Sequence, residues 1–203
     1  MFPILAPITR WLIFANVLVY GAEIAWRGQT LFYLALWPWG SVATAYSAPF
    51  QPWQLITYGF MHDPDGYMHI LFNMLSLFMF GSDVERSMGE KRYFAFYFVC
   101  ILGAGLVQMA AMASGLAPSG MVVGASGAVF GILLAFAIAF PHRRIIMFPI
   151  PVPIPARIFV AIYALAELYF GISARVLGVA HFAHLGGAVA GYLLILYWRH
   201  GRK

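Results

Sequence analysis

Long apolar runs alternate with polar or Gly/Pro-rich breaks along most of the chain. Runs of this length with few charges are typical of helices that cross a bilayer, because about 20 apolar residues span its hydrocarbon core. The pattern predicts an all-α membrane protein with one domain over residues 1–203. We interpret the first run as a retained helix, because no basic segment precedes it and no small-residue cleavage site follows it. The six predicted helices cover residues 10–27, 67–84, 93–113, 126–140, 156–173 and 182–198.

Two of the breaks have a composition of their own. Residues 28–66 are rich in Trp, Tyr and Pro, which suits a structured loop at the membrane–water interface, although an ordinary aromatic belt would have the same composition. Residues 142–157 are rich in proline and cannot be helical throughout. Neither break has the composition of a separate soluble domain.

Composition supports the membrane interpretation. Hydrophobic residues make up 63% of the 203 residues and charged residues only 9%, against about 45–50% and 25% in soluble domains. A soluble fold of this size could not cover its surface with so few charges. Composition therefore excludes a disordered chain, a nucleic-acid-binding module and a secreted disulfide scaffold. The single cysteine, Cys100, allows no intramolecular disulfide.

The basic residues predict the orientation of the helices. If six helices cross the membrane, only Arg27 and Arg175 of the 12 Lys and Arg residues fall on one side. The positive-inside rule then places both termini in the cytoplasm. This asymmetry also explains the net charge of +5 without a nucleic-acid partner. We expect a multi-pass protein of the bacterial inner (cell) membrane, and the sequence predicts no oligomeric state.

Polar residues gather at the outer ends of the second, fourth and sixth predicted helices. Polar side chains within a membrane are costly and usually face a wet cavity, so three groups at the same ends predict one pocket that opens outward. The fourth helix is short, about 22 Å at 1.5 Å per residue, which predicts a re-entrant segment before it. The polar residues are His69 and Asn73, then Ser126, then His181 and His184.

The start of the fourth helix suits anion binding. Free backbone N–H groups at a helix start stabilise anions, and an oxyanion formed by attack of Ser126 would lie beside its own N–H group. Two GxxxG spacings, Gly127 with Gly131 and Gly187 with Gly191, would let the fourth and sixth helices approach closely. Packing of these faces would bring the outer ends of both helices together.

Taken together, these residues resemble a known family. In the order and spacing found here, they are similar to the HxxxN motif, the nucleophile motif and the histidine helix of rhomboid intramembrane serine proteases. The resemblance covers roughly residues 52–192 and implies a six-helix rhomboid bundle. The motifs in this chain are His69-x-x-x-Asn73, Gly124-Ala125-Ser126-Gly127 and Ala183-His184-x-x-Gly187-x-x-x-Gly191.

The resemblance implies an endopeptidase that cleaves transmembrane segments of membrane protein substrates through an acyl-enzyme intermediate. By position, Ser126 is the nucleophile and His184 is the general base and then the general acid. His69, Asn73 and the N–H group of Ser126 would stabilise the oxyanion. No cofactor or metal is implied, and the partners are the substrates and the lipid bilayer.

Other positions receive smaller roles. Phe130, where family members often have tyrosine, is placed to stack on His184. Gln54 stands where the family commonly has an arginine with a structural role in the loop. Glu167, in the fifth predicted helix, is by default a buried functional acid or else a residue of the cavity wall or of the lateral opening, and it is assigned no catalytic role. Three residues near the dyad are interpreted as pocket lining: Gly124, Phe130 and His181.

Other classes of protein account for parts of this pattern. His181 and His184 would also suit interfacial side chains or metal ligands, but zinc needs three or four ligands and the outer ends offer no cysteine. A non-catalytic rhomboid-like factor that binds membrane-protein clients would lack a nucleophile or a base, and both are present here. A small transporter would show inverted repeats and helices broken at the midplane. We therefore predict the protease.

Overall fold

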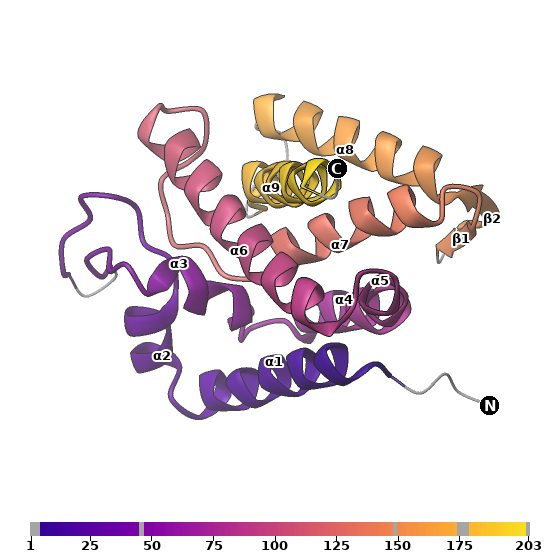
Figure 1. Cartoon of the computed structure of the whole chain (residues 1–203). Coiled ribbons are helices and arrows are strands. Elements are labelled where there is room, and N and C mark those ends of the chain that lie inside the picture. Colours follow the sequence, from indigo (N-terminus) through magenta and orange to yellow (C-terminus); the bar gives the residue numbers. More distant parts are fainter. Residues whose placement is uncertain (1–4, 45–46, 148–149, 174–178, 202–203) are drawn as a thin grey trace.

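The structure is a computed structural model that describes residues 5–44, 47–147, 150–173 and 179–201 (Figure 1). These parts are mostly helical, with one small β hairpin. The elements in chain order are α1 (Pro7–Ala25), α2 (Arg27–Leu34), α3 (Gln54–Thr57), the 3₁₀ turn η1 (Tyr58–Phe60), α4 (Tyr67–Ser76), the π-helical segment η2 (Leu77–Gly81), α5 (Ser82–Met88), α6 (Glu90–Ala113), α7 (Ser126–Ala139), β1 (Arg144–Met147), β2 (Ile150–Pro155), α8 (Ala156–Ser173) and α9 (His181–His200).

Three helices in the described part of the chain, α1, α6 and α8, are long and apolar enough to cross a membrane. Helix α7 is apolar but has only 14 residues, or about 21 Å at 1.5 Å per residue. The run expected at residues 67–84 continues through α4, η2 and α5 to Met88. These apolar helices and the composition make the chain an integral membrane protein.

The loop over residues 28–66 is structured where the structure describes it, and Gln54 anchors it. This side chain is fully buried. Its amide oxygen accepts hydrogen bonds from the backbone N–H groups of Trp37 (3.3 Å) and Gln51 (3.2 Å), and its amide nitrogen donates to the carbonyl of Pro49 (3.4 Å). One neutral amide thus ties Trp37 to residues 49–51 of the loop, at the position where the family resemblance predicts an arginine.

The proline-rich break forms a two-stranded hairpin. Strands β1 and β2 pair antiparallel, with Arg144 opposite Pro155 and Ile145 opposite Ile154. Proline lacks a backbone donor but is tolerated on an edge strand, and both strands of a two-stranded sheet are edges. Helix α8 begins directly after β2. The hairpin therefore joins α7 to α8 without a helical connection.

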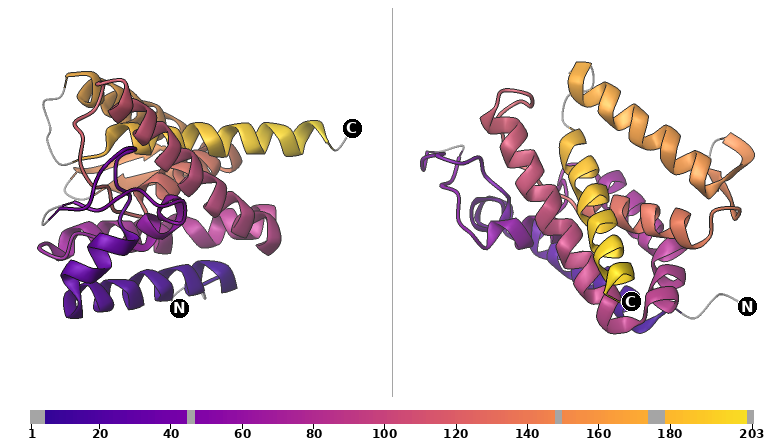
Figure 2. Two further views of the ribbon diagram at one scale, coloured as in Figure 1. Left: turned by 90° about the vertical axis from the view of Figure 1, so that its left-hand side faces the viewer. Right: turned by 45° about the horizontal axis from the view of Figure 1, so that its top comes forward.

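Helix α9 packs against α6 and α7, with α8 along its outer side (Figures 1 and 2). Close approach depends on glycine. A Cβ on Gly187 would lie 2.0 Å from the carbonyl oxygen of Gly127, and a Cβ on Gly131 would lie 2.3 Å from Sγ of Cys100. Gly191 faces α6, where a Cβ would lie 2.8 Å from the ring of Phe96.

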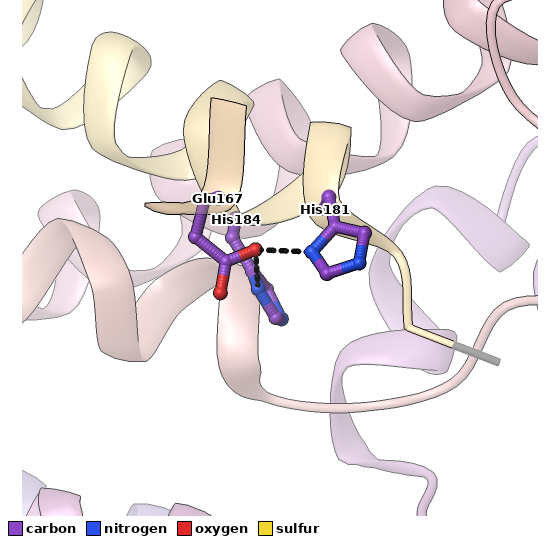
Figure 3. Close-up of side chains that lie close together, drawn as sticks. All are labelled: Glu167, His181 and His184. Carbon is purple, nitrogen blue, oxygen red and sulfur yellow. Dashed lines mark hydrogen bonds and ion pairs between the residues drawn. The ribbon is translucent and has the colours of Figure 1, made fainter. Parts of the chain in front are cut away.

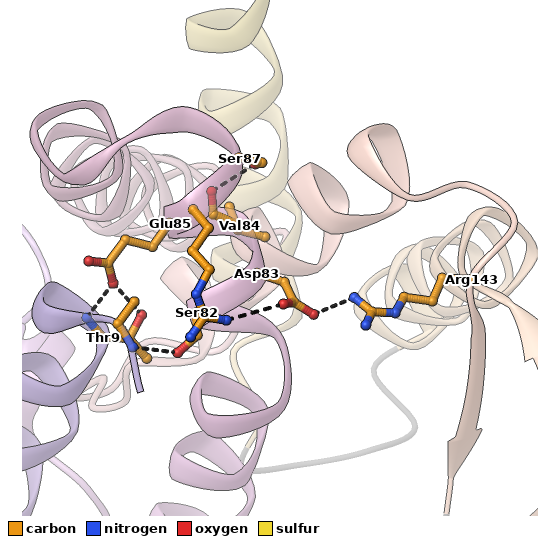
Figure 4. A network of polar contacts seen from close by, with 9 residues as sticks. Thr9, Ser82, Asp83, Val84, Glu85, Ser87 and Arg143 are labelled. Atoms are coloured by element: carbon orange, nitrogen blue, oxygen red, sulfur yellow. Dashed lines mark hydrogen bonds and ion pairs between the residues drawn. The ribbon is translucent and has the colours of Figure 1, made fainter. Parts of the chain in front are cut away.

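Glu85 of α5 joins α5 to the start of α1, at the end of the molecule away from the polar helix starts (Figure 4). Its carboxylate accepts hydrogen bonds from the backbone N–H groups of Ile8 (3.0 Å) and Thr9 (2.8 Å) and from the Thr9 hydroxyl (2.7 Å). It thereby caps the start of α1, whose free N–H groups favour an anion. Asp83, two residues earlier, forms an ion pair with Arg143 beyond the end of α7.

Replacement of Gly187 by alanine is expected to destabilise the fold. The new Cβ would collide with the backbone of Gly127, and a backbone atom cannot move aside as a flexible side chain would. We expect a loss of about 1–3 kcal/mol or more in the free energy of unfolding, measured by thermal unfolding in detergent. Gly21→Ala in α1 is the matched control, because a Cβ there meets nothing within 4 Å. Equal stability of the two variants would contradict this account of the α7–α9 contact.

Candidate active site

Three helix starts meet at one cavity of about 870 Å³. Helices α4, α7 and α9 begin at Tyr67, Ser126 and His181, and each brings its first turns to the cavity wall. The start of a helix carries free N–H groups and a partial positive charge. The cavity is therefore polarised to hold an anion. The sequence-predicted residues that line it are His69, Asn73, Ser126, Phe130, His181 and His184.

Ser126 and His184 both line the cavity and are in direct contact with each other. The Oγ atom of Ser126 lies 2.8 Å from Nε2 of His184, a hydrogen-bonding distance. The ring of Phe130, one turn after Ser126 on α7, stacks on the imidazole of His184 with centroids 4.4 Å apart and planes 6° apart. The stack fixes the plane of the imidazole. A serine hydroxyl beside an accepting imidazole nitrogen is the arrangement from which a nucleophile can be generated.

The backbone before Ser126 is held in an extended path that ends at a glycine. Val122 pairs with Leu36 through two backbone hydrogen bonds of 2.9 and 3.0 Å, and the N–H of Gly124 donates to the carbonyl of Tyr58 at 2.9 Å. Gly124 has φ +132°, a conformation that residues with a Cβ rarely adopt. A Cβ there would lie 2.9 Å from Nε2 of His69 and 3.4 Å from Oγ of Ser126, so both atoms border the same space.

His69 and Asn73 offer hydrogen-bond donors to that space. Nδ1 of His69 accepts a hydrogen bond from the backbone N–H of Asp63 at 3.2 Å, so the ring proton sits on Nε2 when the imidazole is neutral. Asn73, one turn later on α4, donates one N–H to the carbonyl of His69 at 2.9 Å. Its second N–H is left for the cavity, which Asn73 lines.

Glu167 of α8 lies against both histidines of α9, although it was assigned no role from the sequence (Figure 3). Its Oε2 atom lies 2.7 Å from Nδ1 of His181 and 2.9 Å from Nδ1 of His184. The carboxylate is buried. The signal in the sequence was a single acid in an apolar helix, which is a candidate functional group by default. Which way it faced depended on the rotation of α8, and the sequence does not fix that rotation.

The same three residues, Glu167, His181 and His184, are the group in the described part of the chain that could hold a metal ion. Two ligands on one tetrahedral zinc ion lie about 3.3 Å apart, given bond lengths of about 2.0–2.1 Å. The oxygen–nitrogen distances of 2.7 and 2.9 Å are instead those of direct contact. The arrangement fits a carboxylate shared by two imidazoles better than a metal centre.

Most of the chain matches a known protein family. Residues 49–200 match the family described as the Rhomboid domain. The chain belongs to the rhomboid family. This confirms the resemblance inferred from the ordered motifs.

Three relatives illustrate the similarity. The mitochondrial Rhomboid protein 1 of Saccharomyces cerevisiae is 35% identical over 63% of this rhomboid chain and 37% of its own length. RHOMBOID-like protein 4 of Arabidopsis thaliana is 31% identical over 70% of this chain and 33% of its own. Rhomboid protease GlpG of Salmonella choleraesuis is 34% identical over 50% of this chain and 34% of its own. The aligned part thus spans about a third of each of these relatives.

A further histidine of this rhomboid, His62, is fully buried beside His69. Its backbone N–H donates to both carboxylate oxygens of Glu23 at 2.9 and 3.0 Å, and its ring lies edge-on to that of His69. Neither ring nitrogen has a hydrogen-bond partner among the described residues. Burial, with a smaller contribution from His69, lowers the pKa of His62 to about 3 from its ordinary value of 6.5. The ring is therefore neutral in the folded protein at neutral pH.

The buried neutral His62 predicts a loss of stability in acid. Between pH 6.5 and 3, His62 is protonated in the unfolded chain but stays neutral in the folded protein. As the pH falls through this range, His62 therefore lowers the free energy of unfolding by at most about 1.4 kcal/mol per pH unit. Above pH 6.5 the group contributes no pH dependence. We expect His62→Leu to flatten this part of the curve when thermal unfolding is followed from pH 4 to 8. His142→Leu, at an exposed histidine, should leave the slope unchanged. A slope unaffected by His62→Leu would refute the assignment.

Proposed function

We propose that this chain is an intramembrane serine endopeptidase that cleaves transmembrane segments of membrane proteins with a Ser126–His184 dyad. The observation that carries the proposal is the 2.8 Å contact between Oγ of Ser126 and Nε2 of His184 inside the cavity. Membership of a family with relatives named as proteases supports the same reaction class. No cofactor is required.

In the first step, Nε2 of His184 accepts the hydroxyl proton of Ser126 while Oγ attacks the scissile carbonyl carbon. A C–O bond forms and the carbonyl electron pair moves to oxygen, which becomes an oxyanion. Phe130 keeps the imidazole plane in place through its stacking contact. Because serine and histidine lie on two packed helices, the reacting atoms are positioned before substrate arrives.

The oxyanion is stabilised by donors that already face the space beside Gly124. Nε2–H of His69 and the free N–H of Asn73 border the cavity. The backbone N–H of Ser126 lies at the first position of α7, whose first helical bond runs from Val129 to Ala125. It is therefore free of a helical partner. Fixed donors of this kind stabilise charge in the transition state without reorganisation.

Collapse of the intermediate breaks the C–N bond, and the departing amine takes the proton from Nε2 of His184. The acyl group remains on Ser126 as an ester. Water then enters, gives a proton to Nε2 and attacks the ester carbonyl. The second intermediate breaks the bond to Oγ, which regains the proton and restores the free enzyme.

The membrane setting of this site remains part of the proposal. Six crossing segments with both termini in the cytoplasm would put the cavity toward the outer face, where water reaches it, and substrate would enter laterally from lipid. Arg27 and Asp65 form an ion pair at the cavity wall on that side, and this pair holds the pKa of the Asp65 carboxyl below its usual range. The named relatives include bacterial, mitochondrial and plant proteins, so a bacterial inner membrane remains a prediction.

Loss of either dyad residue is expected to abolish the reaction. Ser126→Ala removes the nucleophile and His184→Ala removes the base, so both should lose labelling by a fluorophosphonate probe and cleavage of a transmembrane substrate. Ser114→Ala, outside the cavity at the end of α6, should keep both signals.

These assays use the purified protein in detergent, with folding checked by thermal unfolding. Cleavage at the wild-type rate by either folded dyad variant would refute the assignment of Ser126 and His184 as the dyad. Absence of labelling and cleavage in folded wild type would instead favour a rhomboid-like factor that binds membrane-protein clients without cutting them.

Asn73→Ala tests the oxyanion donors. We expect kcat to fall about a hundredfold to a thousandfold, the usual effect of removing one such donor, with fluorophosphonate labelling slowed because it also forms an oxyanion-like adduct. Asn16→Ala is a matched control, because Asn16 is also buried and also donates to the carbonyl four residues earlier, at 2.7 Å. An unchanged kcat in folded Asn73→Ala would remove this residue from the mechanism.

A further inference from the structure

One carboxylate lies where the proposed dyad would need a third group. Oε2 of Glu167 is 2.7 Å from Nδ1 of His181 and 2.9 Å from Nδ1 of His184 (Figure 3). The approach to His184 does not have hydrogen-bond geometry, and Nδ1 of His184 has no hydrogen-bond partner among the described residues. Glu167 is the acid that contacts this nitrogen, at 2.9 Å.

The stacking of Phe130 on His184 does not by itself determine the orientation of the ring within its plane or its tautomer. Parallel rings 4.4 Å apart fix the plane of the imidazole, but a stack does not determine which nitrogen faces Ser126 or which nitrogen carries the proton. A base at Nε2 requires the proton on Nδ1. An anionic oxygen beside Nδ1 selects that tautomer and stabilises the imidazolium that forms when Nε2 accepts the serine proton.

The arrangement of α8 indicates that this contact is built into the fold. Tyr163, Glu167 and Gly171 are spaced by four residues, so they lie along one face of the helix. Tyr163 packs against Phe130 with ring centroids 4.7 Å apart, and Gly171 lies against His181, where a Cβ would be 3.2 Å from that side chain. Few α8 residues are buried, and Glu167 and Gly171 are two of them.

The surroundings of Glu167 suit an anion. The carboxylate lies beside the first turn of α9, where the helix carries partial positive charge. His181 contacts the same oxygen that faces His184, so it holds the carboxylate in place. His181 and His184 are three residues apart on α9 and share a face of that helix.

We propose that Glu167 is a positioning residue for the Ser126–His184 dyad, with His181 as the residue that holds its carboxylate in place. The carboxylate keeps Nδ1 of His184 protonated and Nε2 directed at Ser126, and it stabilises the imidazolium formed during attack. The inference rests on the proposed function. It adds an acid to a site in which the family resemblance implies only serine and histidine.

Glu167→Gln is the direct test, because it keeps the size of the side chain and removes its charge. We expect kcat for a transmembrane substrate and the rate of fluorophosphonate labelling to fall together by about 10- to 100-fold, the range seen when a group that orients a metal-bound histidine is lost. KM should stay within about twofold, because the change acts on the transition state and not on ground-state binding. Glu85→Gln, which alters another buried carboxylate away from the cavity, should leave kcat unchanged even if stability falls.

His181 provides a second, independent arm. His181→Gln should lower kcat by a smaller factor than Glu167→Gln, because the carboxylate survives but loses one partner. In the Glu167→Gln background, His181→Gln should have no further effect on kcat, because His181 acts through Glu167. Additive losses in the double variant would contradict this order of action.

Three outcomes would overturn the inference. Wild-type kcat in folded Glu167→Gln would show that the carboxylate does not act on the dyad. A raised KM with unchanged kcat would show that it serves only to hold α8 against α9. Loss of wild-type activity with EDTA, restored by Zn²⁺, would show that Glu167, His181 and His184 hold a metal. Ser126→Ala is assayed in parallel, since activity in that variant would refute the proposed function itself.

Discussion

The close contact between the backbones of Gly127 and Gly187 is the constraint on which the site depends. Ser126 directly precedes Gly127, and His184 lies three residues before Gly187 on the same face of α9. Any side chain at Gly187 would push the two helices apart. The 2.8 Å distance between Oγ and Nε2 is therefore set by helix packing and not by a loop, and sites on packed helices hold their geometry more tightly.

Helix starts are the second organising feature. Their free N–H groups need partners, and in a membrane water supplies few of them. The fold meets this need with side chains from other helices: Glu85 caps α1, and the amide oxygen of Gln108 accepts from the N–H of Ala183 in α9 at 3.1 Å. Among the described residues, neither the N-cap residue Ala125 nor a side chain from another helix accepts a hydrogen bond from the first N–H groups of α7, and that is where Ser126 stands. The N–H group left open there is the one that an oxyanion would use.

The sequence predicted much of this architecture, and the misses have physical causes. The apolar runs predicted the helices, and the ordered motifs predicted the family, because both are local patterns. Helix content alone did not reveal the β1–β2 hairpin, because proline excludes helix without specifying a strand pair. The contact of Glu167 with His184 depends on the rotation of α8 about its axis, which only the packing of α8 on α9 fixes. The sequence also did not show that Gln54 anchors the interfacial loop with its amide, because the loop path that brings Trp37 and Pro49 to this side chain is set by tertiary packing.

The presence of a buried carboxylate at this position calls for a reason beyond packing. A well-packed apolar side chain would hold α8 against α9 at least as well, because taking a charge out of water offsets much of what an ion pair gains. A neutral serine–histidine pair also does not need an anion in its resting state. In the proposed mechanism, the need arises only when His184 takes a proton and a positive charge develops in a buried site. The position of Glu167, with one oxygen on Nδ1 of His184 and the same oxygen on His181, meets the requirement of that charged state.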